Sequence, residues 1–302
     1  MKRILITGAN SYIGTSFEEY MKEYDDYQID TLDMKNPEWR NYDFSIYDTV
    51  FHVAGIAHAD VGHVSEEVRK LYYKVNTELT AETAMQAKKS GVRQFIYMSS
   101  IIVYGESAPL GKKKLITAET TPEPANFYGD SKLQADIKLQ EMNDDNFRVC
   151  ILRPPMIYGP GCKGNYQMLS KMAKRLPIFP DIRNERSMLY IGNLCDFIKE
   201  CIDEQKGGIY FPQNSEYIST SQLVFEIAKA NNRTIHLTKA LNPIVYITSK
   251  IPGKIGRMCN KAFGNLCYAK MSIYNDSCYY TLSQSVAITE NIENIERNVS
   301  LK

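Results

Sequence analysis

A tyrosine and a lysine four residues apart form the most reactive pairing in this sequence, Tyr128 and Lys132 in Tyr-Gly-Asp-Ser-Lys. On a helix, this spacing places both side chains on one face. A nearby ammonium stabilises a phenolate and lowers the pKa of the tyrosine, which would allow proton exchange with an alcohol near neutral pH. Upstream, Ser99 and Ser100 end an apolar run, and a hydroxyl there could hydrogen-bond the same substrate oxygen. Alone, the pair is more simply a solvent-exposed pair, because the chain has 21 tyrosines.

A glycine turn near the N-terminus is a second candidate site. Gly8 directly follows an apolar run, and Gly14 comes six residues later. Such glycines let the chain turn sharply, let backbone N–H groups approach a pyrophosphate and let the next helix pack closely on a sheet. Ser11 stands where the usual spacing has its middle glycine, so the pattern depends on the strand before it and the helix after it. The residues expected to line a dinucleotide here are Gly8, Asn10, Ser11, Tyr12, Ile13 and Gly14.

Two later segments extend this dinucleotide site. Asp33 lies 19 residues after Gly14, where a carboxylate can accept hydrogen bonds from a ribose and repel a 2′-phosphate, which favours NAD over NADP. The alternative is that Asp33 is a turn residue at a strand end. Val53, Ala54 and Gly55 end another apolar run with small residues that let the backbone approach a cofactor, whereas His52, inside the run, is expected to be structural.

A parallel sheet is needed to bring these residues together. Short apolar runs alternate with amphipathic stretches, as in βαβ units. We expect strands at residues 3–7, 27–32, 48–53, 94–99 and 147–152, and helices at residues 13–24, 66–90 and 126–142. After residue 160 the composition changes, and helices at 167–175, 193–204 and 220–230 with a strand at 208–211 indicate a smaller lobe. We therefore expect domains at 1–160 and 161–302, whose strands could interleave.

Residues 241–268 mix apolar residues with Lys250, Lys254, Arg257 and Lys261 at roughly helical spacing. An amphipathic helix packed against the protein body is the simpler interpretation. A helix lying on a membrane surface is the alternative.

Composition excludes several classes of function. A net charge of +1 argues against nucleic-acid binding. The seven cysteines form no regular pattern, so we expect no metal site, no disulfide framework and reduced thiols. The sequence has no signal peptide and no run of 18 apolar residues, so we expect no transmembrane segment and a cytoplasmic location.

The motifs and their order resemble the extended short-chain dehydrogenase/reductases, in particular the NAD-dependent epimerase/dehydratase family of UDP-glucose 4-epimerase-like nucleotide-sugar enzymes. The matching segments cover about the first two thirds of the chain: residues 6–14, 51–55, 98–105, 128–132, 152–161 and 186–194. The resemblance implies an α/β fold, a Rossmann-type doubly wound parallel sheet with a smaller C-terminal substrate-binding lobe. It also implies NAD as cofactor and a homodimer. The chain departs from the family at Ser11, in a short segment between Asp33 and Asp48, and after Leu241.

The resemblance also assigns roles to single residues. The catalytic set falls on Ser100, Tyr128 and Lys132, and Asn76, Ser99 and Pro155 fall near the cofactor. Asn165 and Arg186 match positions that approach the diphosphate of the nucleotide sugar. A guanidinium suits that role because it can donate paired hydrogen bonds to phosphate oxygens. The alternative for Arg186 is a surface ion pair with Glu185 or Asp181.

The resemblance implies an NAD-dependent nucleotide-sugar epimerase that works through a transient 4-keto sugar, on a substrate expected to be UDP-linked. Dehydration is disfavoured, because the Asp-Glu pair of dehydrating relatives is replaced by Ile101 and Ile102. The alternative is an NAD(P)H-dependent 4-ketoreductase of a nucleotide-linked 6-deoxy or amino sugar in surface-polysaccharide biosynthesis. A non-catalytic NAD-binding regulatory protein is a third hypothesis, disfavoured by the presence of the catalytic set.

Overall fold

The computed structural model describes residues 1–57, 64–270 and 280–290. The chain divides into two compact units whose segments interleave in sequence. Unit 1 consists of Met1–Gly105, Thr121–Pro155 and Leu194–Pro212, and unit 2 of Glu106–Thr120, Met156–Asn193 and Gln213–Lys302. These units are groups of mutually contacting residues. The predicted boundary after residue 160 concerns folding domains and stays a prediction.

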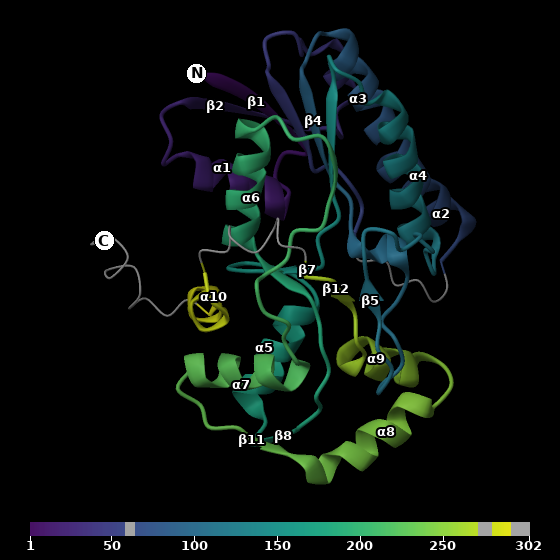
Figure 1. Cartoon of the computed structure of the whole chain (residues 1–302), viewed down its shortest axis with the longest axis vertical. Coiled ribbons are helices and arrows are strands. Elements are labelled where there is room, and N and C mark those ends of the chain that lie inside the picture. Colours follow the sequence, from purple (N-terminus) through teal and green to yellow (C-terminus); the bar gives the residue numbers. More distant parts are fainter. Residues whose placement is uncertain (58–63, 271–279, 291–302) are drawn as a thin grey trace. The chain divides into compact units, whose positions relative to one another are not determined.

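A six-stranded parallel sheet forms the centre of unit 1 (Figure 1). The strand order is β10-β6-β4-β3-β1-β2. The strands are β1 (Lys2–Thr7), β2 (Tyr27–Leu32), β3 (Thr49–His52), β4 (Gln94–Met98), β6 (Arg148–Leu152) and β10 (Gly208–Tyr210). All six strands predicted from the apolar runs are present, and the predicted α/β fold with a parallel sheet is confirmed.

Helices cover both faces of this sheet, as expected of a doubly wound fold. Helices α1 (Tyr12–Met21) and α6 (Ile191–Asp203) lie on one side, and α3 (Thr80–Lys89) and α4 (Phe127–Met142) on the other (Figure 1). On the α3–α4 side, apolar strand residues pack against small and aliphatic helix residues. This part of the core includes Leu5, Val50, Phe95, Ile151, Ala84, Ala87, Ala135 and Leu139.

The order of the strands reverses between β1 and β3. Strand β2 pairs with one side of β1, and the chain then returns to add β3 on the other side. Strand β2 stands last in the strand order and is therefore an edge strand, and the short 3₁₀ helix η1 (Pro37–Asn41) lies in the segment between β2 and β3. In open α/β sheets, ligands bind at such a reversal, beyond the carboxyl ends of the strands.

The helix expected at residues 66–90 is interrupted by a wider turn. Helix α2 (Glu66–Tyr73) continues through a π-helical segment η2 (Lys74–Leu79) into α3. Asn76 lies in η2 with a fully buried side chain. A π-helical insertion is rare and frequently marks a functional region.

The described residues of unit 2 form short elements, with three parallel strand pairs: β7 with β9, β8 with β11 and β5 with β12. Its strands are β5 (Leu115–Ile116), β7 (Met156–Tyr158), β8 (Ile178–Pro180), β9 (Met188–Tyr190), β11 (His236–Thr238) and β12 (Cys267–Tyr268). Its helices are α5 (Asn165–Arg175), α7 (Thr220–Ala230), η4 (Lys239–Leu241), α8 (Asn242–Lys250), α9 (Lys254–Phe263) and α10 (Leu282–Thr289).

The prediction of one packed amphipathic helix at residues 241–268 is wrong in two respects. The helix is divided between α8 and α9, because Pro252 lacks a backbone N–H and Gly253 has a φ of +92°. Its apolar face is also only partly covered: α8 has no buried residue, whereas Phe263 of α9 packs against Phe179 with 5.9 Å between ring centroids.

Within the described part of the chain, no helix is long and apolar enough to cross a membrane. The cytoplasmic location stays a prediction.

Candidate active site

Helix α4 carries the tyrosine and lysine singled out from the sequence. The helix begins after Asn126, whose side-chain Oδ1 accepts a hydrogen bond from the backbone N–H of Gly129 at 3.0 Å. This cap places Tyr128 in the first turn and Lys132 one turn later. The ring of Tyr72 from α2 packs edge-on against Tyr128, with 6.0 Å between ring centroids. The cap and this aromatic contact therefore fix where the hydroxyl of Tyr128 lies.

The pKa of Tyr128 is raised to about 12, chiefly by burial, while a hydrogen bond with Ser100 opposes this effect. The expectation that Lys132 lowers this pKa is wrong for the arrangement seen here. The ammonium of Lys132 donates to the backbone oxygen of Met98 at 2.9 Å and lies 4.8 Å from the ring centroid of Tyr97. Its charge is therefore engaged by β4, while burial dominates at the phenol.

Lys132 is itself perturbed, because only 6% of the residue is exposed. Burial lowers its pKa from 10.5 to about 8, although the carboxylate of Asp136 acts in the opposite direction. A lysine in this state is still mostly an ammonium at neutral pH, and it can lose that charge in mildly basic solution.

A buried ion pair that none of the sequence motifs predicted supports this helix. Asp136 is fully buried and accepts a hydrogen bond from Arg153 Nε at 2.8 Å. Arg153 Nη1 also donates to the hydroxyl of Tyr104 at 2.6 Å. The pKa of Asp136 is raised by burial, which the charge of Arg153 opposes. The sequence spacing could have indicated Asp136, because it follows Lys132 by the same four residues that separate Lys132 from Tyr128 and so lies on the same face of the helix.

The turn between β1 and α1 is shaped by close backbone contacts. Gly8 has a φ of +111°, and a Cβ there would lie 2.6 Å from the backbone nitrogen of Ala54. The backbone N–H groups of Gly8 and Ala9 donate to the oxygen of Leu32 at 2.9 and 3.2 Å. The turn thus lies against the ends of both β2 and β3, where the sequence predicted a dinucleotide site.

Ser11, which replaces the middle glycine, has a structural role. It is the N-cap of α1, and its hydroxyl accepts a hydrogen bond from the N–H of Gly14 at 3.1 Å. The preceding residue, Asn10, adopts a left-handed φ of 64°. Tyr12 and Ile13 then begin the helix. A serine therefore satisfies one of the free N–H groups at the start of the helix and keeps the turn.

Asp33 follows β2 directly beside this turn. It is exposed, and its Oδ1 accepts a hydrogen bond from the N–H of Lys35 at 2.9 Å. With this contact, Asp33 serves as the turn residue of the alternative interpretation, and the contact engages one of its two carboxylate oxygens. Binding of a ribose by Asp33 stays a prediction.

The segment after β3 reaches Lys132. Val53 and Ala54 each donate from their N–H group to the oxygen of Thr7 at 3.0 Å. A Cβ on Gly55 would lie 3.1 Å from both Asn76 Oδ1 and Lys132 Nζ. Gly55, Asn76 and Lys132 therefore meet at one point. Their roles at the cofactor stay predictions.

The side chain of Asn76 joins two segments by hydrogen bonds at this point. Its Oδ1 accepts from the N–H of Ile56 at 2.8 Å, and its Nδ2 donates to the oxygen of Ile56 at 3.1 Å and to Ser131 Oγ at 3.0 Å. These bonds tie the segment after β3 to α4. His52 is structural, as expected, since it is fully buried between the hydroxyls of Thr7 and Thr80, at 2.7 and 3.0 Å.

The ends of β4 and β6 supply the remaining predicted residues. The N–H of Ser99 donates to the oxygen of Leu152 at 2.8 Å, and that of Ile101 donates to Pro154 at 2.9 Å. Ser100 caps the 3₁₀ helix η3 (Ile101–Tyr104), its hydroxyl accepting from the N–H of Ile102 at 3.3 Å. Pro155 is buried at the end of this segment. The hydroxyl of Ser100 thus lies where it can hydrogen-bond Tyr128.

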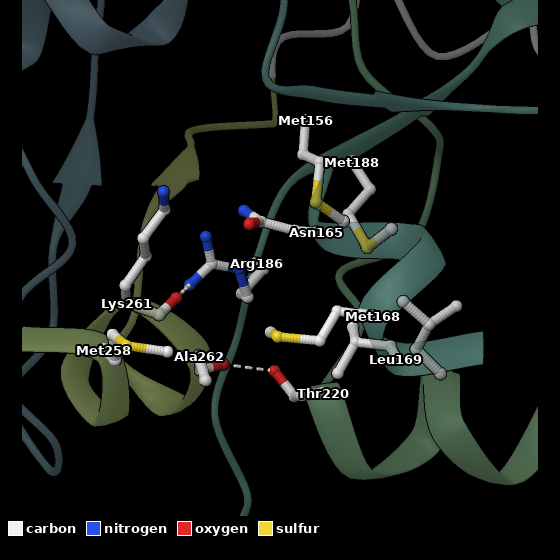
Figure 2. A pocket seen from close by; sticks show the side chains of 11 residues that line it. Met156, Asn165, Met168, Leu169, Arg186, Met188, Thr220, Met258, Lys261 and Ala262 are labelled. Atoms are coloured by element: carbon white, nitrogen blue, oxygen red, sulfur yellow. Dashed lines mark hydrogen bonds between the residues drawn. The ribbon is translucent and has the colours of Figure 1, made fainter. Parts of the chain in front are cut away.

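Unit 2 contains an open pocket of about 680 Å³ (Figure 2). Figure 2 shows the amide of Asn165, the first residue of α5, and the guanidinium of Arg186 directed toward the same space. The structure thus brings together the two predicted substrate-binding residues. The lining consists of Met156, Asn165, Met168, Leu169, Arg186, Met188, Thr220, Leu223, Met258, Lys261 and Ala262.

Arg186 is held by neutral acceptors. Its Nη1 donates to Ser107 Oγ at 3.2 Å and to the backbone oxygens of Lys261 and Gly264 at 2.8 and 3.1 Å. It forms no ion pair with any described residue, so the alternative of a surface pair with Glu185 or Asp181 is not what the structure shows. Burial lowers the pKa of Arg186 below its usual value. The pocket lining contains two cationic residues and no carboxylate, which suits an anionic group.

The residues of unit 1 fit a dinucleotide. The turn at Gly8 has no room for a Cβ, and α1 begins directly after the turn, so its first N–H groups are available to phosphates. Asp33 is the acidic residue at the end of β2, as NAD-binding sites of this type have. NAD would therefore be held by the segments that end β1, β2 and β3.

Comparison with known proteins supports the same assignment. A UDP-glucose 4-epimerase from Vibrio cholerae is 32% identical over 251 residues, which are 76% of each chain. The N-acetyl-alpha-D-glucosaminyl-diphospho-ditrans,octacis-undecaprenol 4-epimerase of Escherichia coli O157:H7 is 29% identical over 281 residues, 83% of this chain and 81% of that one. The crystal structure of UDP-glucuronic acid 4-epimerase from Bacillus cereus in complex with NAD is 17% identical and has a TM-score of 0.70, covering 95% of this chain and 97% of that one. This last likeness shows a shared fold.

A family model gives the assignment directly. The model of the NAD dependent epimerase/dehydratase family matches residues 4–211, which is more than half of the chain. The predicted family, the predicted NAD-dependent enzyme and the predicted cofactor are thereby confirmed. The chain belongs to the NAD dependent epimerase/dehydratase family.

Proposed function

We propose that this enzyme is a 4-epimerase of a sugar diphosphate, with NAD as its cofactor. The observation that carries the proposal is the cluster of Ser100, Tyr128 and Lys132 in unit 1, next to the segment that follows β3. These residues could remove and return the proton of a sugar hydroxyl, and bound NAD supplies the acceptor and donor of the hydride. The family membership supports the same chemistry.

In the proposed reaction, Tyr128 takes the proton of the sugar C4 hydroxyl as the C4 hydrogen leaves as hydride, giving a 4-keto sugar. Ser100 hydrogen-bonds the same oxygen and holds it in place. A pKa near 12 keeps Tyr128 protonated at neutral pH, so a positive charge beside its hydroxyl is needed to favour the phenolate. Lys132, one turn away on α4, is the residue proposed to supply such a charge when substrate and cofactor are bound.

The substrate is proposed to be recognised by its diphosphate. Arg186 and Lys261 are the cations of the unit 2 pocket, and Asn165 adds an amide. The relatives from Vibrio cholerae and Escherichia coli are named for a UDP-sugar and for a sugar diphosphate on undecaprenol, so both names include a sugar on a diphosphate. We propose a UDP-linked hexose as the substrate to test first, with a place in surface-polysaccharide synthesis.

The proposed reaction does not include dehydration. An additional acid and base would be needed directly after Ser100, where the chain has Ile101 and Ile102. Ile101 is buried, and neither side chain can transfer a proton.

The test combines cofactor retention with turnover. The purified full-length chain is denatured to release and quantify bound NAD, and the native enzyme is incubated with UDP-glucose or UDP-N-acetylglucosamine, with and without NADH. Proton NMR identifies the product. We expect NAD to copurify with the protein and the 4-epimer to form without added NADH.

The variant Tyr128→Phe should retain NAD and lose turnover by roughly 10²- to 10⁴-fold, the usual contribution of a positioned acid–base group. Tyr73→Phe is the matched control, because it removes a hydroxyl that donates to Asp130 of the same helix at 2.6 Å. Stoichiometric consumption of NADH by a 4-keto substrate would identify a ketoreductase instead. Full activity of Tyr128→Phe would remove the tyrosine from the mechanism, and a function independent of turnover would support the regulatory hypothesis.

A further inference from the structure

Helices α8 and α9 present an apolar surface that no described part of the chain covers. Ile244 and Ile247 lie three residues apart on α8, Ile251 is the C-cap of that helix, and Ile255 lies in the first turn of α9. Their exposed fractions are 60%, 68%, 43% and 59%, far above those of core isoleucines. We call these four residues the isoleucine row. Helix α8 itself has no buried residue.

Polar contacts hold this surface in place. Helices α8 and α9 lie next to each other in unit 2 (Figure 1). Asn260 Nδ2 donates to the backbone oxygen of Ser249 at 2.9 Å, and Asn260 Oδ1 accepts from the N–H of Leu110 at 2.9 Å. Cys259 Sγ contacts the oxygen of Val245 at 3.4 Å. Since these bonds dock the helices, the isoleucine row is left free to bind something else.

The charge of this region is entirely positive. Residues 227–270 contain eight lysines and arginines and no aspartate or glutamate, although the whole chain has a net charge of only +1. The four cations on and between α8 and α9 are all exposed: Lys250, Lys254, Arg257 and Lys261. Lys250 and Arg257 form no ion pair with any described residue. An apolar row flanked by cations is the composition of a helix that lies in the interface of an anionic membrane.

A second copy of this chain fits the surface less well. A two-fold dimer joins the same patch of both subunits, so this face would bring two sets of four cations together with no carboxylate from α8 or α9 between them. Like charges at an interface oppose association. The phosphates of an anionic lipid surface would instead attract the same cations while the isoleucines enter the acyl boundary.

We propose that α8 and α9 form a peripheral membrane-binding surface, with the isoleucine row inserted among lipid headgroups and the cations against anionic lipid. The residues that carry this inference lie outside the Ser100, Tyr128 and Lys132 cluster, so it stands independently of the proposed reaction. Helix α9 also lines the unit 2 pocket through Met258, Lys261 and Ala262. Membrane binding would therefore bring a wall of that pocket to the lipid surface.

The test is cosedimentation of the full-length chain with vesicles of 30% phosphatidylglycerol and 70% phosphatidylcholine, compared with pure phosphatidylcholine. We expect binding to the anionic vesicles that weakens between about 0.1 and 0.5 M salt. Lys250→Gln/Arg257→Gln should lower the partition coefficient by roughly 30-fold, from the usual contribution of two cations near such a surface. Ile244→Ser/Ile247→Ser should lower it by roughly tenfold or more, because the inserted apolar area is lost.

Each variant has a control elsewhere that removes the same number of exposed cations or exposed isoleucines. Lys138→Gln/Lys171→Gln removes two exposed lysines, and Ile46→Ser/Ile137→Ser removes two isoleucines that are 43% and 42% exposed. Both controls should bind vesicles like the wild type, and all four variants should keep wild-type turnover of a soluble UDP-sugar. Absence of wild-type vesicle binding, or equal losses in controls and variants, would overturn the proposal. So would a wild-type dimer that Ile244→Ser/Ile247→Ser converts to a monomer without any vesicle binding.

Discussion

Replacing Lys132 with methionine should stabilise the protein at neutral pH while it abolishes the proposed reaction. Burial lowers the pKa of Lys132 from 10.5 to about 8, which corresponds to about 3 kcal/mol of unfavourable free energy for its ammonium at pH 7. Methionine keeps a similar length without the charge. The backbone oxygen of Met98 loses a hydrogen bond, a cost of about 1 kcal/mol. The net gain in the free energy of unfolding should therefore be about 2 kcal/mol.

The pH dependence follows from the same lowering of the pKa. Between pH 8 and 10.5 the unfolded chain binds more protons at Lys132 than the folded chain does. The wild type therefore gains stability relative to Lys132→Met as the pH rises through this range. The advantage of the variant should be largest at pH 7, and it should disappear by about pH 10.5.

Urea denaturation of the full-length wild type and variant at pH 7 and 10.5 measures this difference. Lys138→Met is the control, because Lys138 lies exposed on the same helix, and it should show no pH-dependent difference from the wild type. If Lys132→Met is destabilised at pH 7 by the same amount as at pH 10.5, the ammonium is not buried at a cost and the reasoning is wrong.

Two further substitutions test residues around the site. Asp136→Asn leaves the buried guanidinium of Arg153 without its carboxylate, so denaturation should show a loss of about 3–5 kcal/mol. Because Asp136 raises the pKa of Lys132, the basic limb of the pH–rate profile of Asp136→Asn should also move to lower pH. A limb that does not move would show that Asp136 does not influence the titration of Lys132. Asp33→Ser should raise the affinity for NADP relative to NAD by roughly 10- to 100-fold, since a repulsive carboxylate is removed. An unchanged ratio in fluorescence titrations would take Asp33 out of ribose binding.

Much of unit 1 could be predicted from the order of residues. Apolar runs separated by amphipathic stretches predict a parallel sheet, because buried strands and crossover helices have different periodicities. Gly8 and Ser100 could be placed at the same edge of the sheet in advance, because each follows a predicted strand, whereas Tyr128 and Lys132 were joined to them by the family resemblance. Arg186 and Asn165 could be paired only through the family resemblance, since no local periodicity joins them.

Other features depend on contacts between distant segments. The ion pair of Asp136 with Arg153 joins residues 17 positions apart, and the acceptor of Lys132 is a backbone oxygen on β4. For the same reason, the predicted lowering of the pKa of Tyr128 is wrong. The spacing of Tyr128 and Lys132 gives only their separation along a helix, whereas burial by Tyr72 and its neighbours makes the charged phenolate unfavourable and raises the pKa.

The sequence by itself determined the sheet and the glycine turn, because these follow from local spacing and from the conformations that particular residues allow. The choice of Ser100, Tyr128 and Lys132 as reactive residues came from the order of motifs that resembles the family. Only the tertiary structure decided the protonation of those side chains and the face that α8 and α9 leave exposed. Periodicity identifies an apolar face, but whether another part of the chain buries that face depends on packing between distant segments.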